Sequence, residues 1–403
     1  MLSLILHDTK METDSQLNRG NIEDAMALTS LQEGLLFHNL KNPAGDLYFE
    51  QLSLEVSGHV DIPLFEQAWN TVVEINGMLR TVFRWEKMSN PVQVVLKNHR
   101  LSLRYHDLAD GMDDLDETGK RLEILKAADR NETFDLREVP FRVTLCRIAE
   151  NRYVMIISSH HILYDGWSSG IILNDFFNAY NALIRGKNIV KPVRTSFKEF
   201  IRWYQQQDTQ NSETSWKEYF RGMDNDIHME LPVKRPYNRG SRGKSPNSET
   251  LKHKFRITFD RGKENAWDGL IRSYKITPAA LLYGAWGMLL QRYLNRSDVV
   301  FGTTVSGRSA QVEGIEEMVG LFINTVPLRF RVDRSQPGYY TVKDILIDLN
   351  RSLQTREAFE HTPLVKIFQY GGCKSEAEMF DSLVVVENYP LDIRKLRADL
   401  VGE

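Results

Sequence analysis

One short stretch of the chain constrains its fold more than any other, because a buried-strand pattern turns directly into a helical pattern. The apolar run Tyr153 to Ile157 is typical of a buried strand. A few residues later, apolar side chains recur at the spacing of an amphipathic helix, at Ile171, Ile172, Phe176, Phe177, Tyr180 and Leu183. The sequence therefore predicts a strand-to-helix corner between residues 158 and 170.

The same succession of strand and helix patterns recurs along the chain. In the first half, residues 52–56 and 141–145 alternate as strands, and Asp61 and Pro63 begin a helix with apolar residues up to Val73. In the second half, residues 255–259 alternate as a strand, Thr277-Pro278 begins a helix that reaches Leu294, and residues 299–301 restart a strand. The predicted fold class is α/β.

A chain of 403 residues is too long for one small core and suits two lobes. The periodicity is interrupted between Arg185 and Arg194, so we expect an N-terminal lobe over 21–188 and a C-terminal lobe over 189–403. The polar stretch Lys10 to Asp24 predicts a flexible lead-in, which we place at 1–20, and residues 234–249 predict a mobile surface loop.

Composition and the lengths of the apolar runs limit the possible partners of the protein and its location. Lys and Arg number 51 against 54 Asp and Glu, so no basic stripe argues for nucleic acid. The two cysteines, Cys146 and Cys373, fit a reducing compartment and exclude a disulfide framework or a cysteine-rich zinc site. The apolar start of the chain is too short for a signal segment, and no run has membrane-spanning length. We therefore expect a cytoplasmic protein that engages no membrane.

The corner itself carries the residues best suited to chemistry, from His160 to Ser168. Successive side chains of a strand point to opposite faces, so one of His160 and His161 faces a cleft and the other faces the protein. His161 is the candidate to take or hold a proton. Asp165 either forms a relay with it or braces the loop against an arginine, and we favour the brace. Gly166 permits a tight turn, and its amide could donate to developing negative charge.

The residues alone also allow an ordinary packing or hydrogen-bonding role for the histidine pair. A metal site is disfavoured, because neighbouring histidines on a strand diverge and lack the i, i+4 spacing of many zinc hydrolases. No G-x-S-x-G elbow, Walker loop or G-x-G-x-x-G is present. Serine hydrolase, nucleotide and dehydrogenase chemistry all lose support.

The corner resembles a known family. His160 to Gly166 matches the H-H-x-x-x-D-G signature of the condensation domains of nonribosomal peptide synthetases, relatives of chloramphenicol acetyltransferase. Further segments resemble other motifs of this family in the same order, namely Leu28–His38, Leu79–Phe83, Phe301–Arg308, Val319–Arg329 and Glu387–Pro390. The resemblance spans Asn21 to Pro390.

The resemblance implies a fold and a reaction. It implies two chloramphenicol acetyltransferase-like lobes in a V-shaped arrangement, with donor and acceptor carrier protein domains inserting phosphopantetheine arms from opposite ends of the tunnel between them. The acceptor's amine attacks the donor's acyl thioester and an amide forms, with no bound cofactor or metal. Adjacent synthetase modules would be partners. Positioning should supply much of the rate.

The resemblance also implies roles for individual residues. His161 is the cleft residue that takes a proton from the amine or orients it, and His160 is inward-facing and structural. Asp165 braces the loop, and Arg80 is its expected partner. We assign Trp167, Ser168, Ser306 and Asn324 to the substrate channel. The alternatives are a helix start for Trp167 and Ser168, core packing for Trp167 and turn capping for Asn324.

Two departures from the family pattern qualify these expectations. Ile75-Asn76 stands ahead of Gly77-Met78 where the family shows an Arg-His pair. Family members continue further past the Glu387–Pro390 motif than this chain does, so we expect a C-terminally truncated second lobe and reduced solubility or activity.

Three functions stay open at this stage. An amide-forming condensation domain leads, because the signature is intact. A catalytically silent recruitment module and a stand-alone acyltransferase using a soluble thioester are the alternatives. The opening motif is more similar to the subgroup that accepts a D-configured donor residue.

Overall fold

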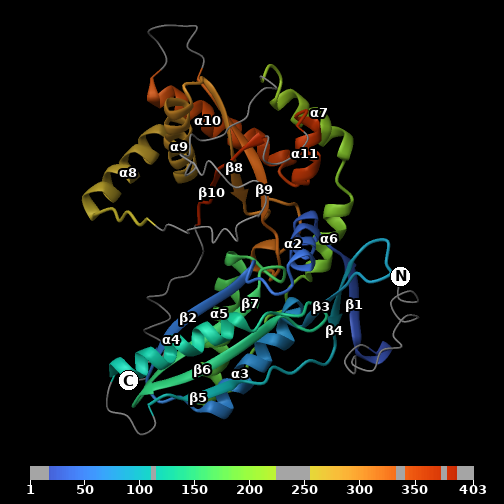
Figure 1. Cartoon of the computed structure of the whole chain (residues 1–403), viewed down its shortest axis with the longest axis vertical. Helices are drawn as coiled ribbons and strands as arrows, with labels where there is room; N and C mark the ends of the chain where they lie inside the picture. Colours follow the sequence, from blue (N-terminus) through green and yellow to red (C-terminus); the bar gives the residue numbers. More distant parts are fainter. Residues whose placement is uncertain (1–17, 110–114, 224–254, 333–340, 374–378, 388–403) are drawn as a thin grey trace, which may run out of the picture. The chain divides into compact units, whose positions relative to one another are not determined.

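The computed structural model describes residues 18–109, 115–223, 255–332, 341–373 and 379–387 (Figure 1). These form two compact units. Of the described residues, the first unit comprises those from 18 to 207, the segment Ser306–Ile323 and Glu387, and the second comprises those within Asp208–Val305 and Asn324–Val386. The loop predicted at 234–249 lies outside the described residues, as does the lead-in up to residue 17.

The first unit extends past the boundary that we predicted at residue 188. Helix α6 (Phe197–Gln205) has an apolar face, and Phe197, Phe200 and Ile201 are buried in the core of the first unit. The periodicity is indeed interrupted around Gly186, where φ is +63°. That interruption therefore marks a connection within the first unit.

A four-stranded sheet organises the first unit, in the order β2–β7–β6–β5. Its strands are β2 (Phe49–Ser57), β7 (Arg152–His160), β6 (Phe141–Ala149) and β5 (Arg104–Asp107). Neighbouring strands are antiparallel except for β5 and β6, which are parallel. The strands predicted at residues 52–56 and 141–145 are confirmed by β2 and β6, although β6 is buried on both faces from Phe141 to Cys146.

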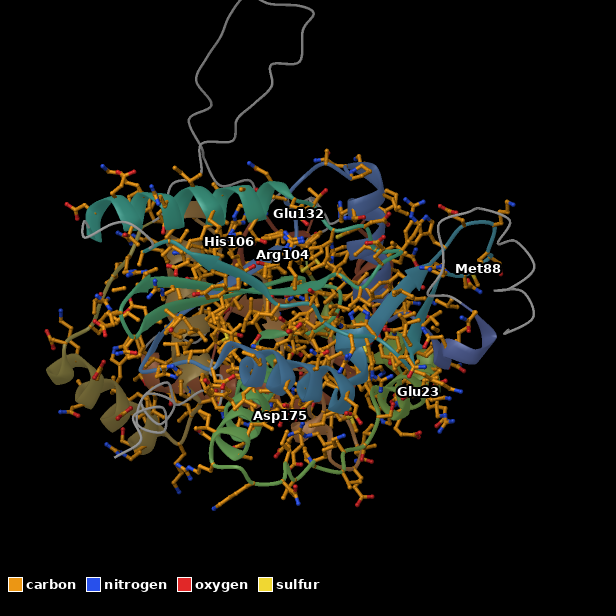
Figure 2. All side chains as sticks on the ribbon, turned by 90° about the horizontal axis from the view of Figure 1, so that it is seen from below. Glu23, Met88, Arg104, His106, Glu132 and Asp175 are labelled. Carbon is orange, nitrogen blue, oxygen red and sulfur yellow. The ribbon has the colours of Figure 1, made fainter. Side chains whose placement is uncertain are left out.

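Helices cover both faces of this sheet. Val154 and Ile156 of β7 pack toward Leu122 of α4 (Leu115–Asn131). Met155 and Ile157 pack into the main core with α3 (Ile62–Ile75) and α5 (Gly166–Ile184). In Figure 2, Glu132, just after α4, and Asp175 of α5 lie on opposite sides of the sheet. Burial on both faces explains why Tyr153 to Ile157 is continuously apolar.

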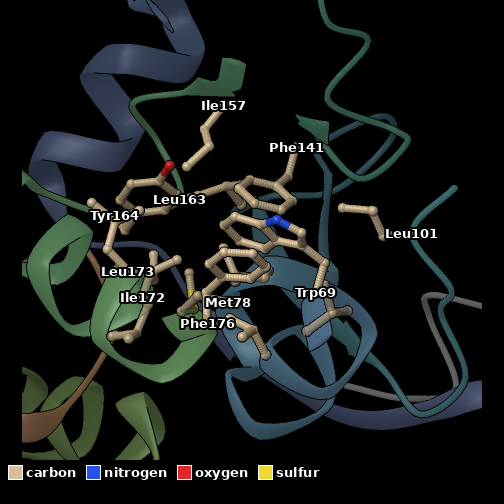
Figure 3. Packing of buried hydrophobic residues seen from close by; sticks show 14 of the residues in the cluster. Trp69, Met78, Leu101, Phe141, Ile157, Leu163, Tyr164, Ile172, Leu173 and Phe176 are labelled. Carbon is tan, nitrogen blue, oxygen red and sulfur yellow. The ribbon is translucent and has the colours of Figure 1, made fainter. Parts of the chain in front are cut away.

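Helices α3 and α5 position the corner. Asp61 caps α3 by accepting from the amide of Leu64 at 3.0 Å, as the Asp-x-Pro start predicted. Trp69 of α3 stacks on Phe176 of α5 with ring centroids 4.6 Å apart. Leu163 and Tyr164 of the corner join the same apolar cluster (Figure 3). The turn that carries the histidines is therefore anchored in the core.

A second sheet of the first unit has the order β1–β4–β3. Its strands are β1 (Ile22–Ala27), β4 (Val92–Leu96) and β3 (Thr81–Arg84). Helix α2 (Ser30–Lys41) follows β1 and begins with a capping box formed by Thr29 and Gln32. The lead-in expected to reach Asp24 ends earlier, because residues from Ile22 onward pair with β4.

The second unit has a smaller sheet, in the order β10–β8–β9, surrounded by helices. The strands are β8 (Asp298–Val305), β9 (Asn324–Arg331) and β10 (Leu383–Val384). The helices are α7 (Thr209–Tyr219), α8 (Arg261–Tyr274), α9 (Pro278–Leu294), α10 (Val342–Arg356) and α11 (Leu364–Tyr370). Thr277 caps α9, so the predicted helix start is confirmed.

The strand predicted at residues 255–259 is wrong. Among the described residues these pair with no strand, and the side chains of Phe255, Ile257 and Phe259 are 90%, 80% and 43% exposed. Period-two alternation gives a strand only where a neighbouring strand supplies the hydrogen bonds. The expected truncation of the second lobe concerns a part of the chain beyond the described residues and stays a prediction.

In the described part of the chain, every helix is too short or too polar to span a membrane.

Candidate functional site

The corner begins where β7 ends, at His160. Pairing with the neighbouring strand reaches one residue further, because the amide of His161 donates to the carbonyl oxygen of Tyr48 at 2.9 Å. The amide of Leu163 then donates to the carbonyl oxygen of His160 at 3.1 Å and closes a turn. The histidine backbone is thus fixed by both the sheet and the turn.

His160 faces the protein interior and is 3% exposed. Its Nδ1 accepts from the amide of Ile162 at 3.1 Å, so the neutral ring carries its proton on Nε2. Burial, followed by the charge of His161, lowers the pKa of His160 to about 4. His160 is therefore neutral at physiological pH and supports the turn.

His161 is the histidine with solvent access, with a side chain that is 22% exposed. Its Nδ1 lies 3.0 Å from the carbonyl oxygen of Tyr164 and 3.3 Å from Oε1 of Glu50. A carbonyl oxygen can only accept, so these partners assign the proton to Nδ1. In the neutral ring, Nε2 is left with its lone pair and can accept a proton or a hydrogen bond.

Asp165 caps helix α5 and braces the corner. Its Oδ1 accepts from the amide and the hydroxyl of Ser168, both at 2.9 Å, and its Oδ2 accepts from the amide of Phe322 at 3.1 Å. The amide of Asp165 donates to the carbonyl oxygen of Gly320 at 3.1 Å. Because Asp165 is 1% exposed and makes no contact with the His161 ring, these contacts fit a brace and not a relay.

The arginine that pairs with Asp165 is Arg308, not Arg80 as predicted. Nη2 of Arg308 lies 3.3 Å from Oδ1 of Asp165, and both side chains are buried. Nη2 also donates to the Ser168 hydroxyl at 2.9 Å, and the guanidinium lies 4.2 Å from the Phe322 ring centroid. The segment Ser306–Ile323 thus supplies both the charge and the amide that hold Asp165.

Arg80 has a different partner. It ends the short helix Gly77–Arg80, where Nη1 pairs with Oε2 of Glu23 on β1 at 2.7 Å and also donates to the carbonyl oxygen of Leu96. The β1–β4 edge therefore supplies partners for both terminal nitrogens of its guanidinium. The prediction failed because sequence order does not show which carboxylate lies nearest an arginine.

The four predicted channel residues lie in different surroundings. Ser168 is fully buried within the brace, so its side chain cannot line a channel. Trp167 is partly exposed, and its Nε1 donates to the carbonyl oxygen of Glu316 at 3.0 Å. Ser306 is exposed, and its hydroxyl accepts from the amide of Arg308 at 3.3 Å.

Asn324 belongs to the second unit and begins β9. Its Nδ2 donates to the carbonyl oxygens of Glu360 and Thr362 at 2.7 and 2.8 Å. The side chain thus secures a loop, in keeping with the capping alternative.

Gly166 is the first residue of α5 and is not among the glycines with positive φ. The first amides of a helix have no acceptor within the helix, so a donor role for the Gly166 amide stays a prediction. Across the described ranges, no three His, Cys, Asp or Glu side chains are grouped so that they could hold a metal ion.

Two contributors to the corner were not recognised from the sequence. Gln32 of α2 donates through Nε2 to the carbonyl oxygen of Ile162 at 3.0 Å, and its place in the opening motif was a usable signal. Glu50 of β2 contacts His161, and no sequence motif pointed to it.

The fold and the braced corner define a class of protein, and comparison with known sequences identifies it. The sequence model of the condensation domain matches residues 22–400, so the chain belongs to the condensation-domain family. Gramicidin S synthase 2 of Brevibacillus brevis is 33% identical over 381 residues, which is 94% of this chain and 8% of that protein. Surfactin synthase subunit 3 of Bacillus subtilis (strain 168) is 33% identical over 382 residues, 94% of this chain and 28% of that protein.

Solved structures give the same fold. The first condensation domain of the CDA synthetase matches with a TM-score of 0.68 and 17% identity, covering 92% of this chain and 81% of that chain. The predicted α/β condensation-domain fold is therefore confirmed. The chain spans only a small part of the synthetases that it resembles.

Proposed function

We propose that this chain catalyses amide-bond formation between two carrier-bound substrates. The amine of an aminoacyl group on the acceptor carrier protein attacks the acyl or peptidyl thioester on the donor carrier protein, each held on a phosphopantetheine arm. Membership of the condensation-domain family supports this reaction class. The partners would be the two carrier domains and adjacent synthetase modules, in the cytoplasm.

One observation carries the proposal, namely the state of the His161 ring. Its Nδ1 is engaged by acceptors, and Nε2 is the atom left to receive a proton. An imidazole in this state is suited to an amine nucleophile, which must lose a proton as it attacks. The corner therefore positions the ring through Nδ1 and leaves Nε2 for the substrate.

The proposed reaction balances without any further reagent. The amine nitrogen forms a bond to the thioester carbonyl carbon, and Nε2 of His161 accepts a hydrogen bond or the proton from that nitrogen. The tetrahedral intermediate collapses, the carbon–sulfur bond breaks, and the departing thiolate of the donor arm takes up the proton. The Gly166 amide is our candidate donor to the oxyanion.

The test is a condensation assay with loaded carrier proteins, comparing the parent with His161→Ala. General acid–base groups contribute about 10²–10⁴-fold, so we expect product formation to fall by at least about a hundredfold. His106→Ala is the matched control, because His106 lies on β5 with an exposed side chain (Figure 2). Unchanged product formation in a folded His161→Ala variant would remove His161 from the mechanism.

The same assay separates the alternative functions. Equal turnover of a soluble acyl thioester and a carrier-bound one would indicate a stand-alone acyltransferase. A folded parent protein that binds carrier proteins but forms no product would indicate a recruitment module.

A further inference from the structure

Strand register brings Glu50 to the histidine that the proposed reaction uses. In the antiparallel pair β2–β7, Glu50 lies opposite Ser159. His161 is two residues beyond Ser159, which makes it the diagonal neighbour of Glu50 on the same face. Long side chains reach one another at this diagonal, and Oε1 of Glu50 lies 3.3 Å from Nδ1 of His161.

The backbone makes this pairing rigid. The amide of His161 donates to the carbonyl oxygen of Tyr48 at 2.9 Å, two residues before Glu50. Tyr48, directly before β2, therefore fixes the main chain of His161, and Glu50 of β2 contacts its ring. Among the described residues, His161 is the one ion-pair partner found for the Glu50 carboxylate.

The contact is suited to a ring that changes its charge. Nδ1–H points to two acceptors, the Tyr164 carbonyl oxygen at 3.0 Å and the Glu50 carboxylate. A carbonyl dipole orients the ring in both of its charge states, whereas a carboxylate gains most when the ring becomes an imidazolium. Glu50 therefore favours the product of proton transfer to Nε2.

We propose that Glu50 is the positioning residue for His161 and that, together with the Tyr164 carbonyl oxygen, it supports the tautomer with Nε2 free and stabilises the imidazolium that forms when Nε2 takes a proton from the amine. This inference rests on the proposed function for its role in the reaction. The tautomer and the charge effect are properties of the free protein and can be measured without substrate.

Other titratable groups surround this pair and act on it together. Burial raises the pKa of Glu50, the His161 charge lowers it, and the carboxylates of Asp165 and Glu387 raise it. His160 lies next to His161 along the chain and stays neutral. Several charges therefore act on this contact, and the experiment follows the His161 ring directly.

The decisive measurement is the nuclear magnetic resonance titration of ¹⁵N-labelled histidines in the full chain, comparing the parent with Glu50→Gln. We expect the charged-to-neutral transition of the His161 ring to move to lower pH in the variant, because a partly exposed carboxylate next to an imidazole favours the charged form of the ring. Because the Tyr164 carbonyl oxygen still accepts from Nδ1, we expect the Nδ1–H tautomer of the neutral ring to persist. Glu50→Asp, which keeps the charge on a shorter arm, should recover part of the shift.

Glu55→Gln is the matched control. Glu55 lies on the same strand but on the opposite face, 3.8 Å from Arg152, with a side chain that is 62% exposed. If the His161 resonances follow the same pH dependence in Glu50→Gln as in Glu55→Gln, the inference is overturned, whatever the activity.

The condensation assay then connects the contact to the reaction. If His161 is the base, Glu50→Gln should lower kcat about 3- to 30-fold with little change in KM and move the acidic limb of the pH–rate profile to lower pH. A kcat and pH profile equal to those of Glu55→Gln would overturn the role in the reaction. An active His161→Ala variant would instead refute the proposed function, while the titration would still report the contact.

Discussion

The corner between β7 and α5 has two sides that differ in how far their charged and titratable groups are exposed to solvent. On the inner side, Asp165, Ser168 and Arg308 are at most 8% exposed, and the Asp165 carboxylate accepts hydrogen bonds at both oxygens. On the outer side, His161 and Glu50 are 22% and 44% exposed at their side chains.

This difference separates holding a shape from moving a proton. A buried ion pair with satisfied hydrogen bonds keeps one charge state and one geometry. A partly exposed imidazole beside a carboxylate can change its charge while its position stays fixed. The inner side therefore supplies rigidity, and the outer side keeps its titratable atoms available for chemistry.

Removing the inner arginine should have the largest effect on stability. Arg308→Met leaves the Asp165 carboxylate buried without its cation, which costs about 3–5 kcal/mol when a buried pair is broken. We expect the free energy of unfolding, measured by urea denaturation, to fall by that amount.

Arg351→Met is the control for this prediction. Arg351 pairs with Asp348 at 2.7 Å, but its side chain is 70% exposed, and exposed pairs contribute about 0–1 kcal/mol. Equal losses in the two variants would show that the inner side is no more rigid than the surface.

Sequence patterns predicted individual helices and strands better than the pairing between strands. The helices at Pro278 and after Asp61 start where capping residues and proline indicated, because such signals act locally. Phe255, Ile257 and Phe259 alternate equally well, yet these residues form no strand in the described part of the chain. An alternating pattern predicts which face of a strand would be buried. It does not show whether a partner strand is present to pair with it.

The candidate site was predictable only in part, for a related reason. His160, His161 and Asp165 are adjacent in sequence, so the period of a strand sufficed to separate an inner from an outer histidine. Arg308 lies 143 residues from Asp165, and the pairing of Glu50 with His161 depends on strand register. Neither relationship is encoded in local periodicity.

The second prediction concerns the pH dependence of stability that His160 causes. The pKa of His160 is about 4 in the folded protein against an ordinary value of 6.5, so the unfolded chain binds more protons between these values. Stability from neutral His160 is complete above pH 6.5 and is lost as the pH falls toward 4. His160→Asn keeps an acceptor for the Ile162 amide but does not titrate.

Between pH 7 and 4.5, the parent should lose about 2–3 kcal/mol more free energy of unfolding than His160→Asn. Urea denaturation at the two pH values measures the difference. Parallel losses in parent and variant would mean that His160 is solvated and that the inner side of the corner is open to water.

The smallest expected effect tests whether the segment Ser306–Ile323, which holds Asp165, can relax around a larger side chain. Gly307 has φ +67°, and a Cβ there would lie 2.0 Å from the carbonyl oxygen of Phe322. Gly186 has a similar φ of +63° with no atom within 4 Å of the added carbon. In both Gly→Ala variants the new alanine must adopt a left-handed backbone conformation, which costs free energy. Only Gly307→Ala must also displace the main-chain carbonyl group of Phe322.

We therefore expect Gly307→Ala to lower the free energy of unfolding by about 1–2 kcal/mol more than Gly186→Ala, measured by urea denaturation. The backbone strain would act on the segment that supplies Arg308 and the Phe322 amide to Asp165. Equal losses would mean that this segment relaxes around the new side chain. The rigidity of the corner would then arise from β7 and α5 alone, and the contrast between its two sides would concern charge and not stiffness.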